Sequence, residues 1–146
     1  MYGFRIGAQI GLSKSKQVMD DFKRVGDYSV RARFSSVSRP AMSVIGKIFA
    51  SPDLKTGFKA ELADARLILE KRIALFQSCA DREGLKYLPY GGGFFIGVET
   101  KNCRIFEDLV ADGVYVIAMP GLIRIALSSV NLDDIPRLVA AIKKNV

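Results

Sequence analysis

A single long helix is predicted for residues 51–84, which read SPDLKTGFKAELADARLILEKRIALFQSCADREG. Ser51, Pro52 and Asp53 are typical of a helix start, because serine caps free N–H groups, proline suits the first turn and an acid favours the positive end of the helix dipole. Apolar residues then recur at helical spacing until Gly84. They are Leu54, Phe58, Leu62, Ala65, Leu69, Ile73, Phe76 and Ala80. At ~1.5 Å per residue, a helix of roughly thirty residues spans about 45 Å, which is longer than a small domain is wide. We therefore expect it to bridge two lobes.

Downstream of this helix, residues 85–146 predict a compact domain that mixes strands and short helices. Strands are expected at 85–88, 94–99, 114–118 and 123–128, where short apolar runs are bounded by glycine and proline. Helices are expected from Asn102 to the glycine at position 113 and over residues 132–145, whose first turn holds two aspartates.

Upstream of the long helix, residues 1–50 change pattern three times. Apolar and polar residues alternate from Phe4 to Ile10, which predicts a strand. Ser13 is expected to cap a helix that runs to about Val25 and stops at Gly26. Residues 27–40, DYSVRARFSSVSRP, are expected to form a loop rich in arginine and serine, and a helix is expected again over 41–50. The predicted organisation is therefore three parts: 1–50, 51–84 and 85–146.

The positive charge is concentrated near the amino terminus. The chain carries 22 Lys and Arg against 15 Asp and Glu, and residues 1–47 alone hold nine of the basic residues and three of the acidic ones. Clustered basic residues indicate a nucleic-acid surface or a compact site for small anions, or they merely solvate a surface. Composition does not choose among these three. No basic motif interleaved with aromatic residues accompanies the charge, so we do not expect a nucleic-acid partner.

Composition excludes several classes of protein. The chain has no histidine, which removes serine and cysteine nucleophiles activated by imidazole and most catalytic zinc sites. Cys79 and Cys103 are too few and too far apart for a disulfide framework or a metal ribbon, so we expect no metal site and a cytoplasmic location. The most apolar stretch, 114–130, is shorter than a membrane span and contains Pro120, Gly121 and Arg124, and no membrane partner is expected.

Five segments together resemble a known family. They are YGFRIGA at 2–8, RARFSSVSRPAMS at 31–43, SPDL at 51–54, LPYGGGFFIGV at 88–98 and GLIRIALSSVN at 121–131. In this order they resemble the class I aminotransferases that use pyridoxal phosphate, and the similarity is greatest to the aspartate and aromatic amino acid branch of fold type I. The resemblance covers the whole chain but only the carboxy-terminal portion of such an enzyme. It implies a mixed α/β fold: the end of a large domain, a bridging helix, and a small domain with a mostly antiparallel sheet.

The resemblance gives roles to two arginines. Arg5, in YGFR, matches the family arginine that binds the cofactor phosphate, whereas the residue alone favours an arginine that caps a sheet edge in contact with solvent. Arg124 matches the arginine that grips the α-carboxylate of the substrate. A buried guanidinium is costly unless it is paired, and a carboxylate ligand would pair it. An outward-facing arginine on an edge strand fits the same alternation of residues.

Two further residues gain weaker roles from the resemblance. Phe95 lies at the family position of an aromatic wall beside the substrate, although phenylalanines in strands are often plain core. Arg31 lies near the place where some aspartate-type enzymes send an arginine into the neighbouring subunit to read a dicarboxylate. Arg33 and Arg39 compete with it for this role.

No catalytic residue is assigned within the chain. The Schiff-base lysine of the family would lie a few positions upstream of Met1, and Lys14 and Lys16 do not replace it by spacing. We therefore expect the carboxy-terminal part of an aminotransferase that transfers an amino group between an amino acid and a 2-oxo acid, with this chain alone inactive and binding the cofactor poorly. A non-enzymatic remnant that binds anions or other proteins is the alternative. Exposed apolar surface is expected to cause self-association.

Overall fold

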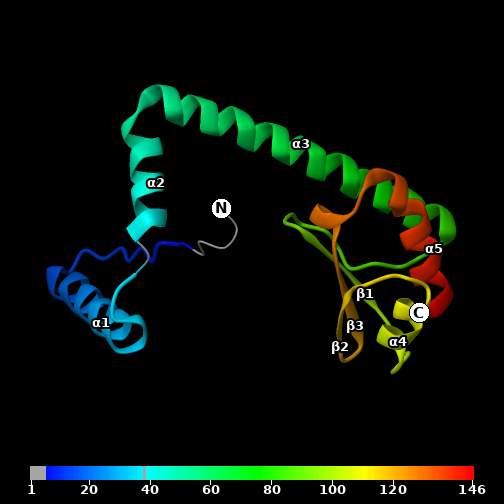
Figure 1. The fold of residues 1–146 in the computed structure, drawn as a ribbon. Coiled ribbons are helices and arrows are strands. Elements are labelled where there is room, and N and C mark those ends of the chain that lie inside the picture. The colour runs from blue at the N-terminus through cyan, green and yellow to red at the C-terminus, as the bar shows by residue number, and fades with distance from the viewer. Residues whose placement is uncertain (1–5, 38) are drawn as a thin grey trace. The chain divides into compact units, whose positions relative to one another are not determined.

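The computed structural model describes residues 6–37 and 39–146 (Figure 1). Arg5, for which the resemblance implies a phosphate contact, lies outside the described residues. The chain divides into two compact units, residues 1–60 and 61–146. The helix α3, Pro52–Glu83, runs from the first unit into the second. Its predicted start is confirmed, since the Ser51 hydroxyl accepts a hydrogen bond from the Leu54 N–H at 3.4 Å. At its other end Gly84 has a φ of +64°, which suits a glycine after a helix.

The first unit is helical. It contains α1, Lys16–Phe34, α2, Arg39–Ala50, and the first turns of α3. The helix predicted over 41–50 is confirmed as α2. Between α2 and α3, the rings of Phe49 and Phe58 pack with their centroids 6.5 Å apart.

The expected stop of α1 at Gly26 is wrong. The helix begins after Ser15, whose hydroxyl accepts from the Val18 N–H, and continues through Gly26 to Phe34, so most of the expected loop at 27–40 is helical. An interior glycine costs a helix only about 1 kcal/mol relative to alanine. Lys23 and Asp27 form an ion pair of 2.9 Å across this glycine, one helical turn apart, which offsets part of that cost.

The expected strand at 4–10 is also wrong for the residues that the structure describes. Residues 6–10 are irregular and exposed, and they carry no ladder of hydrogen bonds. Alternation predicts which residues would share a face of a strand, but a strand forms only beside another strand that accepts its backbone bonds. The first unit contains no such partner among its described residues.

The second unit contains a three-stranded sheet with helices on one face. Its strands are β1, Phe95–Glu99, β2, Ile117–Met119, and β3, Leu122–Ala126, in the order β1-β3-β2, and both pairings are antiparallel. Its helices are α4, Ile105–Ala111, and α5, Ile135–Asn145, with short 3-10 turns at Leu127–Ser129 (η2) and Leu132–Asp134 (η3). The mixed α/β class with a mostly antiparallel sheet is confirmed.

The strand boundaries differ from the expected ones. Residues 85–88 form no strand, because only the Leu88 N–H reaches the sheet, where it donates to the Gly97 carbonyl at 2.8 Å. The strand expected at 114–118 is limited to 117–119, and the one expected at 123–128 ends at Ala126. Beyond Ala126 the chain turns into η2, so its apolar residues leave the sheet and still reach the core.

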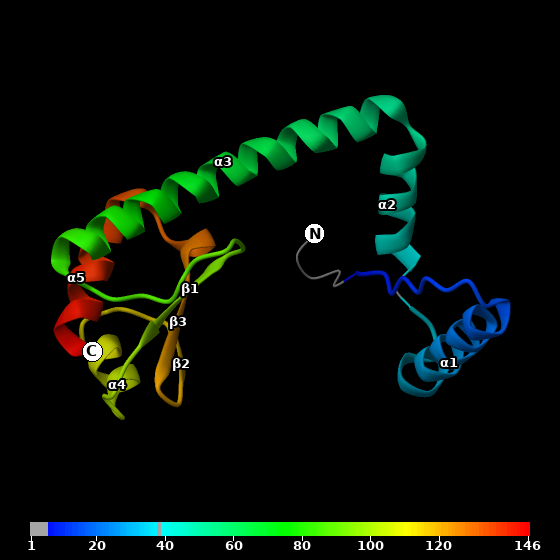
Figure 2. The ribbon, with the colours of Figure 1, turned by 180° about the vertical axis from the view of Figure 1, so that it is seen from behind.

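One core holds the second unit together. The carboxy-terminal part of α3, α4 and α5 pack on one face of the sheet, and Figure 2 shows α5 alongside the end of α3. The residues at the centre of this core are Ile73, Phe76, Cys79 and Ala80 of α3, Ile96 and Val98 of β1, Ile123 and Ile125 of β3, and Ile135, Val139 and Ile142 of α5. The apolar stripe of α3 is therefore buried only from Ile73 onward, while Leu54 and Leu62 are more than half exposed.

Polar contacts tie α4 to the end of α5. Asn102 donates to the carboxylate of Asp108 and to the carbonyl of Asn145, each at 2.9 Å. Asp112 accepts from Lys144 and from the Asn145 side chain, and these bonds hold the pKa of its carboxyl below the usual value. None of the helices in the described part of the chain is long and apolar enough to cross a bilayer.

Candidate functional site

Arg124 lies in the middle of the central strand. It pairs with Gly97 of β1 on one side and with Ile117 of β2 on the other, so the alternative of an edge-strand arginine is wrong. Its neighbours Ile123 and Ile125 are buried in the core. Because successive side chains of a strand point to opposite faces, Arg124 projects from the face of the sheet that the helices leave uncovered.

Phe95 lies against the Arg124 guanidinium. The central guanidinium carbon is 4.4 Å from the centroid of the phenyl ring, a distance typical of a cation–π contact. Phe95 is 41% exposed, so it is not the plain core residue that a strand phenylalanine often is. The register explains the contact, since Phe95 and Gly97 share a face of β1 and Gly97 lies directly across from Arg124. The pair forms one small patch, and we call Phe95 and Arg124 the Phe95–Arg124 patch.

Glycine at position 97 makes room for two leucine side chains beside this patch. A Cβ atom on Gly97 would lie 2.9 Å from Leu88 Cδ1 and 3.3 Å from Leu122 Cδ1, which is closer than such atoms normally approach. Without that atom, Leu88 and Leu122 fill the surface beside Arg124. The flat backbone at position 97 also leaves the guanidinium free to lie across β1 toward Phe95.

The Arg124 side chain is half-buried, and its Nε atom is fully buried. Within the described residues, Nε has no hydrogen-bond acceptor. None of the ion pairs found among the described residues involves Arg124. A buried donor without an acceptor costs about 1–3 kcal/mol, and more for a charged group. The patch therefore has the properties of an anion site, because the cation lies over an aromatic ring and no acidic side chain of residues 6–37 or 39–146 forms an ion pair with it.

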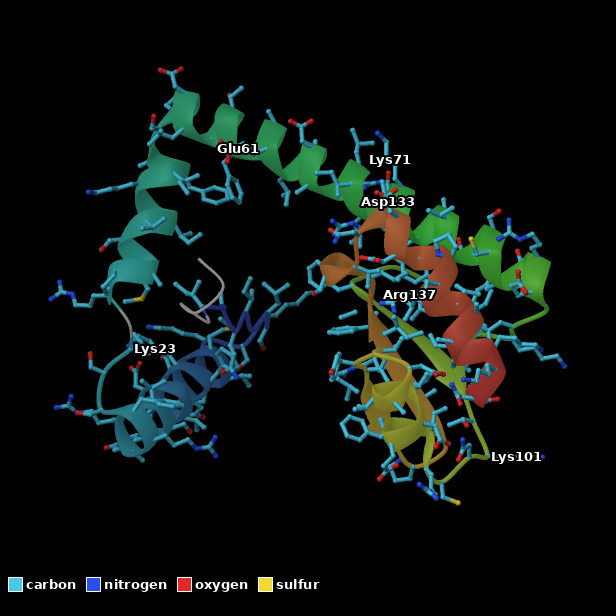
Figure 3. All side chains as sticks on the ribbon, turned by 45° about the vertical axis from the view of Figure 1, so that its right-hand side comes forward. Lys23, Glu61, Lys71, Lys101, Asp133 and Arg137 are labelled. Carbon is cyan, nitrogen blue, oxygen red and sulfur yellow. The ribbon has the colours of Figure 1, made fainter. Side chains whose placement is uncertain are left out.

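Arg31 has a local structural contact in the first unit. It lies in the last turn of α1, and its Nη1 donates to the Ser35 carbonyl at 3.0 Å, just beyond the helix end. Ser35 has a φ of 60°, and the arginine stabilises this turn by satisfying a carbonyl that the helix leaves free. Arg31 also lines an open groove of about 900 Å³ together with Lys23, which Figure 3 labels, and Arg33. Arg39 lies at the start of α2 and is exposed.

Sequence reasoning missed Arg72. This residue of α3 is half-buried, and its Nη1 donates to the Ser128 carbonyl in η2. Like Arg124, it has a buried Nε atom without an acceptor in the described part of the chain. The two residues of this contact are 56 positions apart, so no local pattern could have revealed it. The adjacent apolar position, Ile73, indicated only which side of the helix is buried.

The uncovered face of the sheet suits an anionic group such as a carboxylate. The uncovered face of the sheet carries Phe95, Gly97, Glu99, Ile117, Met119, Leu122, Arg124 and Ala126, by strand alternation. No lysine for the cofactor aldehyde occurs among these positions. Arg5, the phosphate ligand that the resemblance implies, lies outside the described residues. Within the described residues, this face offers the Arg124 guanidinium to an anionic group. Among the described residues, no cluster of histidine, cysteine, aspartate or glutamate forms a metal site.

Comparison with known proteins identifies the family of the chain. The sequence profile described as aminotransferase class I and II matches residues 1–142. One similar solved structure is an aminotransferase from Anaerococcus prevotii, with 30% sequence identity and a TM-score of 0.91. The match covers 98% of this chain and 35% of that chain, so the chain spans about a third of its length. No curated protein matches. The fold, the order of the motifs and the profile agree, and the chain belongs to the class I and II aminotransferases.

Proposed function

We propose that Arg124 binds the α-carboxylate of the substrate in an aminotransferase that moves an amino group between an amino acid and a 2-oxo acid. The observation that carries this proposal is the half-buried guanidinium of Arg124, which lies on the Phe95 ring and has a buried Nε without an acceptor in the described chain. A carboxylate is the natural partner, because its two oxygens match the planar fork of a guanidinium.

Phe95 would orient the arginine and shape the pocket. A guanidinium stacked on a ring keeps its edge, which carries the N–H donors, free for a ligand in the plane of the fork. The exposed part of Phe95 would then meet the substrate beside its carboxylate. The central position of β3 supports this role, since hydrogen-bonded strands on both sides hold the backbone of Arg124 in place.

The other roles implied by the resemblance are part of the same proposal. Members of the family generally use pyridoxal phosphate, which carries the amino group between the two substrates. Arg5 would bind the cofactor phosphate, and Arg31 would bind a second carboxylate, as the matching arginine does in some aspartate-type enzymes. The proposed location is the cytoplasm, on the ground that two cysteines do not make a disulfide framework.

A titration with pyruvate and a neutral analogue tests carboxylate binding. In the chain labelled with ¹⁵N-arginine, pyruvate is expected to move the Nε–Hε resonance of Arg124 in a saturable way, because a carboxylate changes the charge next to that group. Pyruvamide, which lacks the carboxylate, should leave the resonance in place. The Arg104 resonance is the internal control, since Arg104 is exposed and makes no side-chain cap bond. If pyruvate and pyruvamide act alike on Arg124, the proposed role is wrong.

We further propose that the chain alone does not transfer amino groups. Support comes from the uncovered sheet face, where no strand position near Arg124 is a lysine. With pyridoxal phosphate followed by borohydride, peptide mapping should find scattered, substoichiometric labelling of exposed lysines, and amino acids should not be turned over. Stoichiometric labelling of one lysine together with amino transfer would contradict this proposal.

Self-association is also proposed for the isolated chain. Support comes from α1, in which no residue is buried, although Val18, Phe22 and Val25 line up as an apolar stripe and remain 42% to 65% exposed. Light scattering across a dilution series should find dimers or larger species that dissociate on dilution. Replacing Phe22 and Val25 by serine is expected to shift the distribution toward monomers, whereas Tyr115→Ser, at an exposed aromatic outside this stripe, should not. A strictly monomeric wild type would show that the apolar stripe of α1 does not cause self-association.

A further inference from the structure

We infer that Arg72 is a positioning residue for Arg124, an inference that rests on the carboxylate role proposed above. Arg72 and Arg124 are the two residues of the described chain whose buried side-chain polar atoms lack a hydrogen-bond partner. In Figure 3, the neighbouring Lys71 marks the turn of α3 that carries Arg72. Half-burying the Arg72 guanidinium beside the core costs desolvation free energy, and its hydrogen bond to the Ser128 carbonyl in η2 offsets part of that cost.

The contact fixes the point where the chain leaves β3. Arg72 Nη1 donates to the Ser128 carbonyl, two residues after the last residue of the strand. A carbonyl in a single 3-10 turn has no strand partner, so a charged donor from α3 is the group that holds it. Arg72 therefore ties the turn η2 to the long helix.

The same turn connects to Phe95. The Leu127 N–H donates to the Phe94 carbonyl at 3.0 Å, and the Leu127 side chain is fully buried. Phe94 directly precedes Phe95, whose ring lies 4.4 Å from the Arg124 guanidinium carbon. A displacement of η2 would thus move the start of β1, the phenyl ring and the arginine together.

The loop before β1 makes this anchor necessary. Gly92 and Gly93 have φ values of +130° and +93°, conformations that glycine adopts freely, so the chain enters β1 through a segment with little intrinsic stiffness. On that side the Tyr90 hydroxyl, which donates to the Gly93 carbonyl at 2.7 Å, is the local restraint. The bond from η2 to Phe94, and Arg72 behind it, restrains the other side.

Arginine-labelled variants of the full chain test this role. The ring current of Phe95 should give the Arg124 Hε proton an unusual chemical shift, which Phe95→Leu removes and thereby identifies. Arg72→Met, which deletes the donors and keeps an unbranched stem, is expected to move that proton most of the way toward the Phe95→Leu position. It should also weaken pyruvate binding by about two- to thirtyfold, the range for a contact that acts through other residues. Arg72→Lys, which keeps a charged donor, should restore most of both signals.

Arg66→Met is the matched control. Arg66 lies on the same helix, is exposed and pairs with Glu70 one turn away, so its loss should change neither the Arg124 proton nor the affinity for pyruvate. If Arg72→Met does not fold, Arg72→Gln, whose amide stops short of Ser128, takes its place with the same expectations.

The inference and the proposed function fail separately. Wild-type chain that does not bind pyruvate would overturn the carboxylate role, while the Arg124 proton would still decide whether Arg72 holds the patch. Wild type that binds pyruvate, together with an Arg72→Met variant that binds it equally and keeps the Arg124 proton in place, would overturn the positioning role alone.

Discussion

Replacing Arg124 by lysine is expected to lower kcat/KM for amino acid substrates at least tenfold in an active enzyme that carries this segment. Lysine keeps the charge but loses the planar fork and the stacking on Phe95. Hydrogen bonds to charged groups contribute about 1.5–3 kcal/mol each, and 1.36 kcal/mol corresponds to a factor of ten. The test enzyme is a chimera in which residues 1–146 replace the matching part of the Anaerococcus prevotii aminotransferase, and its own amino transfer is measured first.

The controls separate substrate binding from stability. Arg104→Lys changes an exposed arginine of the same unit and should leave kcat/KM unchanged. Cofactor retention should be nearly the same in Arg124→Lys and in the parent chimera, because the proposed partner of Arg124 is the substrate. Arg5→Lys is expected to act in the opposite way and to weaken cofactor retention first. If Arg124→Lys lowers the melting temperature and leaves kcat/KM unchanged, the arginine has a structural role and the substrate-binding role is wrong.

Replacing Phe76 by alanine is expected to destabilise the second unit by about 3–5 kcal/mol, which is a large part of the stability of a domain of this size. Phe76 is fully buried at the centre of the core, and its ring meets Tyr87 edge to face at 6.0 Å. The truncation would leave a cavity between α3 and the sheet. Because the chain has no tryptophan, urea unfolding is followed by the amide resonances of β1 and β3. These resonances report the free energy of unfolding of the second unit alone.

Phe106→Ala is the comparison for Phe76. Phe106 lies in the same unit, on α4, and is 47% exposed, so its removal should cost much less than that of Phe76. The two variants delete the same atoms, so the difference between their free energies of unfolding reports how deeply each phenylalanine is buried. Equal free energies of unfolding for the two variants would mean that the core is not packed as described.

Features with local causes could be predicted from the sequence. The bounds of α3 follow from Ser51, Pro52 and Gly84, which act within one turn of the helix. The positions of β1 and β3 follow from short apolar runs beside glycines. The resemblance correctly identified the family and the fold class, because it rests on five separate segments in a fixed order.

Features that depend on distant partners could not be predicted. The continuation of α1 is a different case, because its cause is local: Gly26 is typical of a helix end, but the helix runs through it and the exposed Lys23–Asp27 pair spans it. The alternation at 6–10 lacks a neighbouring strand in the described chain. For the site, the sequence singled out Arg124 and Phe95, but their contact depends on the pairing of β1 with β3, and the Arg72 contact depends on tertiary packing.

The central position of β3 has a consequence for which parts of the protein unfold locally. Amide hydrogens of a strand with neighbours on both sides, above a buried core, exchange with solvent only when the whole unit unfolds, whereas a helix with no buried residue exchanges through small local openings. Arg124 therefore belongs to the slowest-exchanging part of the described chain, and α1 is expected to exchange faster than the buried strands and helices of the second unit. Proteases that attack transiently opened segments would remove α1 first and leave the arginine in a folded remainder.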